Sequence, residues 1–199
     1  MRKVVLIIGG CFLIAVGVVT AVTATLVTFI LPESYASTAR ILPGVKEPLA
    51  IATEVEKIQS KSVLFQVITN LNLNKSWAQK FKEEADLRTE MTYLILKTKL
   101  DVHQARNTLL IEIKVYSDDK NEAAAIANEI VNVYQQSPLA IKTPEGKPAI
   151  QIIDKAEPGF RPVRPNKPLS IALGCGMGAI LGALGIGVLL LSRRRSSKG

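Results

Sequence analysis

His103 is the single histidine among 199 residues, and it is the first candidate for metal or acid–base chemistry. A protein metal site needs several nitrogen, sulfur or carboxylate ligands at matched spacing. Both cysteines, Cys11 and Cys175, fall inside long apolar runs, so neither can join His103. The sequence therefore predicts no metal site, and we expect His103 to lie exposed on the polar face of a strand.

Acidic residues cluster in one predicted helix, where they alternate with lysines and arginines. Mixed charges of this kind are typical of a solvated helix surface, and no pair stands out as a general acid and base. Gly146-Lys147 lacks the upstream glycine of a phosphate-binding loop. No nucleophile has a plausible orienting base, so we expect a protein that is not an enzyme and needs no cofactor. The acidic residues are Glu83, Glu84, Asp86 and Glu90.

Charge is absent from two long stretches at the ends of the chain. There are 29 consecutive uncharged residues from Val4 to Pro32 and 25 from Pro168 to Ser192. About 20 apolar residues suffice to cross a hydrocarbon core of about 30 Å. We therefore expect transmembrane helices at 4–31 and 169–191. The first is too long for the apolar core of a cleaved signal peptide.

The net charge of +8 lies mostly at the two ends. Without the terminal basic residues, 19 basic residues face 17 acidic ones, so the middle of the chain has no basic surface for nucleic acid. Dense basic charge beside a span favours the cytoplasmic side. We expect a multi-pass protein of the bacterial plasma (inner) membrane, with residues 1–3 and 192–199 cytoplasmic and the middle domain exported. The anchoring residues are Arg2, Lys3, Arg193, Arg194 and Arg195, with Lys198 beyond them.

The middle region, residues 32–157, has the patterns of an α+β domain. Apolar residues recur at helical spacing in some segments and alternate with polar residues in others. The predicted order is β-α-α-β-β-α-β, with helices covering one face of a small sheet. The expected strands are 34–42, 100–103, 109–115 and 149–153, and the expected helical segments are 48–58, 62–71, 76–96 and 118–134.

Residues 158–168 form a proline-rich junction before the second span. Prolines three or four residues apart hold a chain extended and stop helices and strands from continuing. The junction is either a stiff spacer that sets the distance of the domain from the bilayer or a plain linker. Its prolines are Pro158, Pro162, Pro165 and Pro168.

Gly174, Gly178 and Gly182 follow one another at intervals of four in the second span. Glycines at this spacing share a helix face and allow close approach of another membrane helix. The pattern predicts a face for oligomerisation or for a partner helix.

Taken together, these segments resemble the polysaccharide co-polymerase family, the chain-length determinant proteins of bacterial surface polysaccharide assembly. The proline-rich junction beside a glycine-rich span is the most specific part of the resemblance. The other matching segments are Pro32–Ala39, Lys61–Leu71, Thr108–Ile113, the Asp118–Tyr134 helix with Ala125-Ile-Ala-Asn128, and Ile152–Ala156.

The resemblance implies a homo-oligomeric ring of inner-membrane subunits that regulates the length or export of an O-antigen, capsule or exopolysaccharide. A polysaccharide polymerase or export machinery, membrane lipid and further copies of the chain are the implied partners. The family's junction prolines and packing glycines correspond to those named above. The long helical extension of larger members is missing between about Asn72 and Leu100.

Two other functions remain open from the sequence. The eight residues after Leu191 contain no nucleotide-binding motif and no tyrosine, so we expect a short member without a kinase domain. Such a chain could act through its basic tail as the membrane adaptor of a separate tyrosine kinase. The third possibility is a two-span sensor whose exported domain binds a small ligand.

Overall fold

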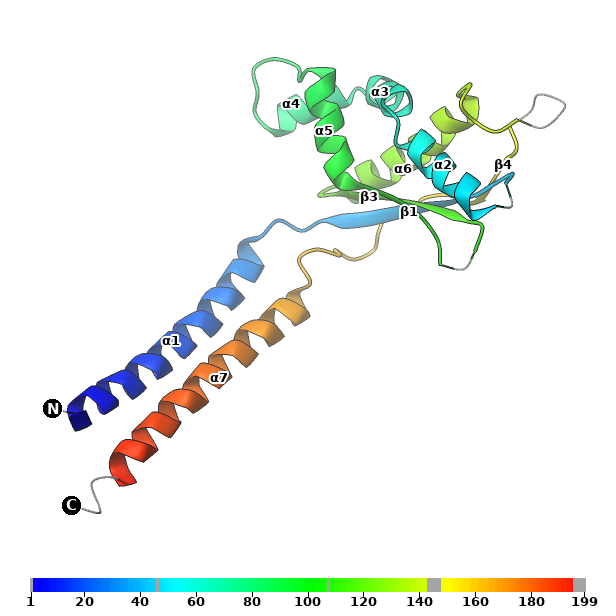
Figure 1. Cartoon of the computed structure of the whole chain (residues 1–199). Helices are drawn as coiled ribbons and strands as arrows, with labels where there is room; N and C mark the ends of the chain where they lie inside the picture. Colours follow the sequence, from blue (N-terminus) through cyan, green and yellow to red (C-terminus); the bar gives the residue numbers. More distant parts are fainter. Residues whose placement is uncertain (1, 46, 107, 143–147, 195–199) are drawn as a thin grey trace. The chain divides into compact units, whose positions relative to one another are not determined.

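The computed structural model describes residues 2–45, 47–106, 108–142 and 148–194, which form two units (Figure 1). One unit, Met1–Glu33 with Val163–Gly199, combines the two ends of the chain and is called the helical hairpin. The other, Ser34–Pro162, is called the domain.

The helical hairpin consists of α1 (Arg2–Ile30) and α7 (Lys167–Arg194), which lie side by side (Figure 1). Each contains a 24-residue apolar segment, with mean hydropathy 2.4 in α1 and 2.1 in α7. At 1.5 Å per residue such a segment is about 36 Å long, which exceeds a hydrocarbon core of about 30 Å. Both helices are therefore long and apolar enough to cross a membrane.

The domain is built on a four-stranded antiparallel sheet with the order β2-β3-β1-β4. Residues 37, 39 and 41 of β1 and residues 111, 113, 115 and 117 of β3 face the core, and the residues between them face away from it. This alternation produces one buried face and one wet face, as the sequence predicted. The strands are β1 (Tyr35–Pro43), β2 (Leu100–Gln104), β3 (Ile111–Ser117) and β4 (Ile150–Asp154).

Five helices cover the buried face of the sheet (Figure 1). The longest, α6 (Lys120–Gln136), packs on β1 and β3 through the apolar stripe that the sequence predicted. Asp119 caps its N-terminus by accepting a hydrogen bond of 2.8 Å from the Asn121 amide. The other four are α2 (Pro48–Ile58), α3 (Lys61–Asn70), α4 (Leu73–Lys80) and α5 (Thr89–Lys99). The α+β class and the one-sided helical layer agree with the expectation.

The helix expected over 76–96 is wrong in detail, because the chain forms two helices, α4 and α5, around a loop at residues 81–88. Four helices thus lie between β1 and β2, where three helical segments were expected and the predicted order counted two helices. Lys82 has a positive φ of 59°, which an α-helix does not allow. Trp77 is fully buried, whereas Phe81, Met91 and Leu94 of the expected apolar stripe are about half exposed.

Candidate functional site

The two long helices pack through small residues that oppose one another. A β-carbon built on Gly178 would lie 2.7 Å from the Gly17 carbonyl oxygen, and one on Gly174 would lie 2.5 Å from the Ala24 β-carbon. Both distances are shorter than any real contact, so only glycine fits. The predicted face therefore meets α1 of the same chain at two of its three glycines. At Gly182 a β-carbon would meet nothing within 4 Å.

Further small residues belong to the same seam, and the sequence analysis missed them. A β-carbon on Gly185 would lie 2.8 Å from the Gly10 carbonyl oxygen. Gly10, Gly17 and Ala24 of α1 are spaced by seven residues, the repeat that keeps one face of a helix against a neighbour. This seven-residue spacing was the feature of the sequence from which the α1 side of the seam could have been predicted. It indicates that the glycines hold the hairpin itself together.

The junction prolines fall into different local structures. Pro158 and Pro162 lie outside helices and strands, in the chain after β4, and the peptide bond between Arg164 and Pro165 is cis. The last, Pro168, lies in the first turn of α7, where a missing amide hydrogen is tolerated. Asn166 precedes this turn and accepts a hydrogen bond of 3.3 Å from the Leu169 amide.

Asn128 of α6 binds the backbone of Ala156, two residues before the junction. Its side-chain amide donates to the Ala156 carbonyl oxygen, and its oxygen accepts from the Ala156 amide, each at 2.9 Å. Ala156 is buried, so these two bonds satisfy backbone groups that water cannot reach. Sequence reasoning included Asn128 in the resemblance without assigning it this role.

A row of charged side chains crosses the wet face of the sheet. The strand register aligns His103, Glu112, Arg40 and Asp154 across all four strands. Arg40 lies 2.9 Å from Glu112 and 3.5 Å from Asp154, and His103 lies 3.5 Å from Glu112. His103 also contacts Asp101 at 3.2 Å. The histidine is thus half exposed on a strand, as expected, with Glu112 as a partner across the sheet and Asp101 as a partner on its own strand.

A second polar cluster joins the N-terminus of α6 to α4. Trp77 donates a hydrogen bond of 2.7 Å to Glu122, and Lys80 contacts both Glu122 and Asp118. Burial lowers the pKa of Lys80, but the hydrogen bonds and charges of the two carboxylates outweigh it and raise the pKa overall. Burial likewise raises the pKa of Asp118, but the hydrogen bonds from Lys80, the backbone and Ser117, together with the charge of Lys80, outweigh it, so the pKa of that carboxyl lies below its usual value. The cluster therefore ties α4 to the end of β3 and the start of α6.

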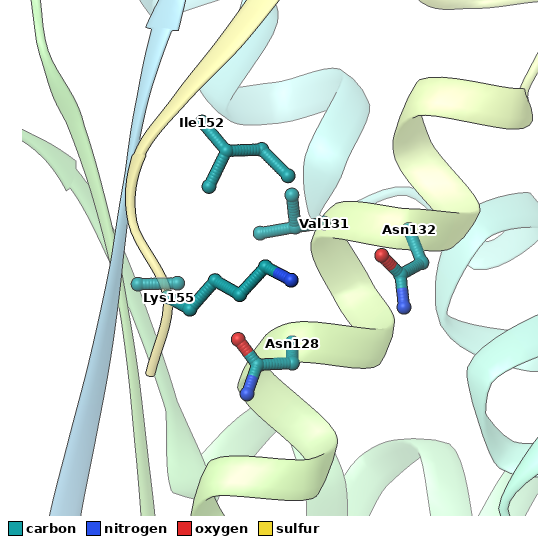
Figure 2. A pocket seen from close by; sticks show the side chains of 6 residues that line it. Asn128, Val131, Asn132, Ile152 and Lys155 are labelled. Atoms are coloured by element: carbon teal, nitrogen blue, oxygen red, sulfur yellow. The ribbon is translucent and has the colours of Figure 1, made fainter. Parts of the chain in front are cut away.

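A small hollow of about 170 Å³ lies between β4 and α6. Figure 2 shows the Lys155 side chain extending across it toward α6. Asn128 lines it too, but both of its polar atoms are bonded to Ala156. The hollow is smaller than a usual ligand site and has few unused polar groups. Its lining residues are Ala39, Asn128, Val131, Asn132, Ile152 and Lys155.

Among the residues that the structure describes, no three His, Cys, Asp or Glu side chains come together as a possible metal site. Of the expected cytoplasmic anchors, Arg2 and Lys3 belong to the first turn of α1, and Arg193 and Arg194 belong to the last turn of α7. Arg195 lies outside the described residues. The molecule is thus an α+β domain carried between two apolar helices.

Comparison with known proteins gives one informative similarity. No protein-family model matches the chain. The chain is 28% identical over 160 residues to a probable capsular polysaccharide biosynthesis protein, YwqC, of Bacillus subtilis (strain 168). The match covers 75% of this chain and 63% of the relative, so the chain spans less than two thirds of that protein's length. It supports a loose relationship to polysaccharide biosynthesis proteins.

Proposed function

We propose that this chain is a non-catalytic inner-membrane scaffold of bacterial surface polysaccharide biosynthesis. It regulates the length of the polymer, its export or both, and it acts through homo-oligomers. The observation that carries the proposal is an α+β domain between two membrane-length helices in a chain similar to a capsular polysaccharide biosynthesis protein. The proposed partner is a polysaccharide polymerase or the export machinery.

The antiparallel packing of α1 and α7 supports the proposed topology. Gly10 of α1 opposes Gly185 of α7, whereas Ala24 opposes Gly174, so the two helices run in opposite directions. A membrane hairpin of this kind has both ends on one side. Both termini are then cytoplasmic and the domain is exported, with the polymer on the same side as the domain.

Of the two edges of the sheet, the one formed by β4 is the proposed contact between copies. In the described part of the chain β4 pairs with β1 alone, and Ile152 of β4 lines the hollow beside α6. Unpaired backbone groups on an edge strand favour pairing with another chain. Half-buried Ile152 supplies apolar surface there.

The polymer itself provides the decisive test. Deleting the gene in its own organism should change the length distribution of the surface polysaccharide or the amount exported, and the intact gene should restore it. Gel electrophoresis of the purified polysaccharide measures length, and sugar analysis of medium and cells measures export. Unchanged length and unchanged export would contradict the proposal.

Two glycine variants separate oligomer contacts from packing within the hairpin. Gly178→Leu disrupts the seam with α1, because Gly17 leaves no room for a side chain. Gly182→Leu adds the same side chain where the hairpin leaves open space. If copies pack through α7, cross-linking in the membrane should show fewer oligomers for Gly182→Leu with the hairpin intact. Normal oligomers in this variant would remove α7 from the proposed interface.

A further inference from the structure

Phe160 is the most exposed large apolar side chain of the described part of the domain. Its side chain is 95% exposed, whereas the next, Leu49, is 81% exposed. Isolated exposed apolar residues are common, and a side chain this exposed adds almost no buried apolar area to the domain. The Phe160 side chain is therefore free to contact a surface outside the domain.

The backbone beside Phe160 is held in place. A β-carbon on Gly159 would lie 2.7 Å from the Ala36 carbonyl oxygen, so this glycine lies directly on the start of β1. Three residues earlier, Ala156 is bonded to Asn128 of α6. Phe160 thus projects from a fixed point of the domain rather than from a loose segment.

The chain next to Phe160 leads into a membrane-length helix. Lys167, the first residue of α7, comes seven residues later. At 3.3–3.6 Å per residue, even a fully extended chain keeps Phe160 within about 25 Å of Lys167. A contact with the bilayer surface is therefore within covalent reach, and it would continue the membrane contact that α7 makes.

The charge beside Phe160 suits a lipid surface. Arg161 follows directly, is exposed and forms no ion pair within the ranges that the structure describes. Aromatic and basic side chains next to a span are typical of the membrane interface, where the ring lies near the acyl boundary and the cation binds lipid phosphate.

We propose that Phe160 and Arg161 form an interfacial membrane contact, with the ring in the headgroup region and the guanidinium on phosphates of anionic lipid. The contact is independent of the proposed role in polysaccharide biosynthesis and requires only that α7 spans the bilayer. It holds one corner of the exported domain against the membrane. The proline-rich junction then follows the bilayer surface rather than acting as a spacer.

Fluorescence of the full chain in lipid nanodiscs tests this contact. Phe160→Trp places a probe at the site, and Leu49→Trp is the matched control at another exposed position. Native Trp77 is fully buried and gives the same background in both. Nitroxide-labelled phosphatidylcholine should quench the Phe160→Trp emission more than the Leu49→Trp emission, and only the former should be blue-shifted.

Two results would overturn the lipid contact. Equal lipid quenching of both variants, with Phe160→Trp open to aqueous iodide, would show that the residue faces water. Protection of Phe160→Trp from lipid nitroxide and iodide alike would assign the ring to a protein partner or a second copy. Both variants should melt like the native chain, which establishes that each is folded.

Anionic lipid tests the part of Arg161. Adding phosphatidylglycerol to the nanodiscs should increase lipid quenching of Phe160→Trp, and high salt should reverse the increase. Arg161→Gln in the same background should lose this dependence. Quenching that ignores phosphatidylglycerol would overturn the role of Arg161.

Discussion

The carboxylate of Glu54 on α2 is buried in the core, with 3% of the residue exposed. The Tyr134 hydroxyl of α6 donates a hydrogen bond to it, and Lys57 lies 2.7 Å from its other oxygen. Burial, together with the hydrogen bond and charge of Glu54, raises the pKa of Tyr134. A buried charge with two partners is tolerated, but losing a partner is costly.

Tyr134→Phe removes one of these partners and should lower the free energy of unfolding by about 1–3 kcal/mol. Denaturant unfolding of the full chain in detergent, followed by Trp77 fluorescence, measures the effect. Tyr93→Phe is the control, because Tyr93 is also buried and its hydroxyl has no hydrogen bond to the described residues. Equal losses in the two variants would show that Glu54 does not depend on Tyr134.

The Lys80–Asp118 pair should make stability depend on pH at the acid limit. Because folding lowers the pKa of Asp118 below 3.8, its contribution is present above that value and is lost as the pH falls further. Asp118 is 47% exposed, so solvent limits the effect to less than about 1 kcal/mol.

Asp118→Asn should flatten the decrease in melting temperature as the pH falls below 3.8, where the native carboxylate becomes protonated. Glu84→Gln, at an exposed position in the loop between α4 and α5, should leave the decrease unchanged. At the alkaline limit the sign reverses: the raised pKa of Lys80 means that its contribution is lost as the pH rises above 10.5. If the melting temperature of Asp118→Asn fell with decreasing pH as steeply as that of the native chain, the pH dependence would belong to other carboxyls.

At the scale of elements, α6 connects the sheet to the end of β4 through Asn128. Asn128→Ala leaves the buried backbone amide and carbonyl of Ala156 without partners, which should cost about 1–3 kcal/mol in unfolding free energy. Asn132, one turn later, is exposed and bonds only to Glu129 within the described residues. Asn132→Ala should therefore change stability by less than about 0.5 kcal/mol. Similar losses of unfolding free energy in the two variants would show that the Asn128–Ala156 hydrogen bonds do not stabilise the domain.

Sequence periodicity predicted most elements of the domain because burial is one-sided. The alternation in β3 and the stripe of α6 each follow from one apolar face, and Asp119 caps the helix. Periodicity failed at residues 81–88, since a left-handed residue at Lys82 breaks a pattern that apolar spacing alone would continue. It also could not align His103, Glu112, Arg40 and Asp154, because their alignment depends on strand register.

The predicted glycine face shows the same limit. Spacing identified close helix packing at Gly174 and Gly178, but spacing carries no information on whether the neighbouring helix belongs to the same chain. The opposing seven-residue spacing in α1 resolves this only once both helices are placed side by side.

At the scale of the whole molecule, the hairpin predicts that both termini lie on one side of the membrane. A green fluorescent protein fused to either end should fluoresce, because it folds in the cytoplasm. Alkaline phosphatase inserted in the domain, within the loop at residues 81–88, should be active on the other side. Activity of a terminal phosphatase fusion would contradict the hairpin as a transmembrane unit.

The contact between Gly159 and Ala36 means that the domain starts and ends at one place. Because its two ends are adjacent, the domain resembles an insertion between α1 and α7. Another domain with adjacent ends can replace it without changing the distance between the two connections. The same pair of long helices can then carry different domains. Chimaeras that graft the domain of a longer relative between residues 34 and 162 should keep the native hairpin, and such exchange offers a route by which related chains could acquire domains of different size.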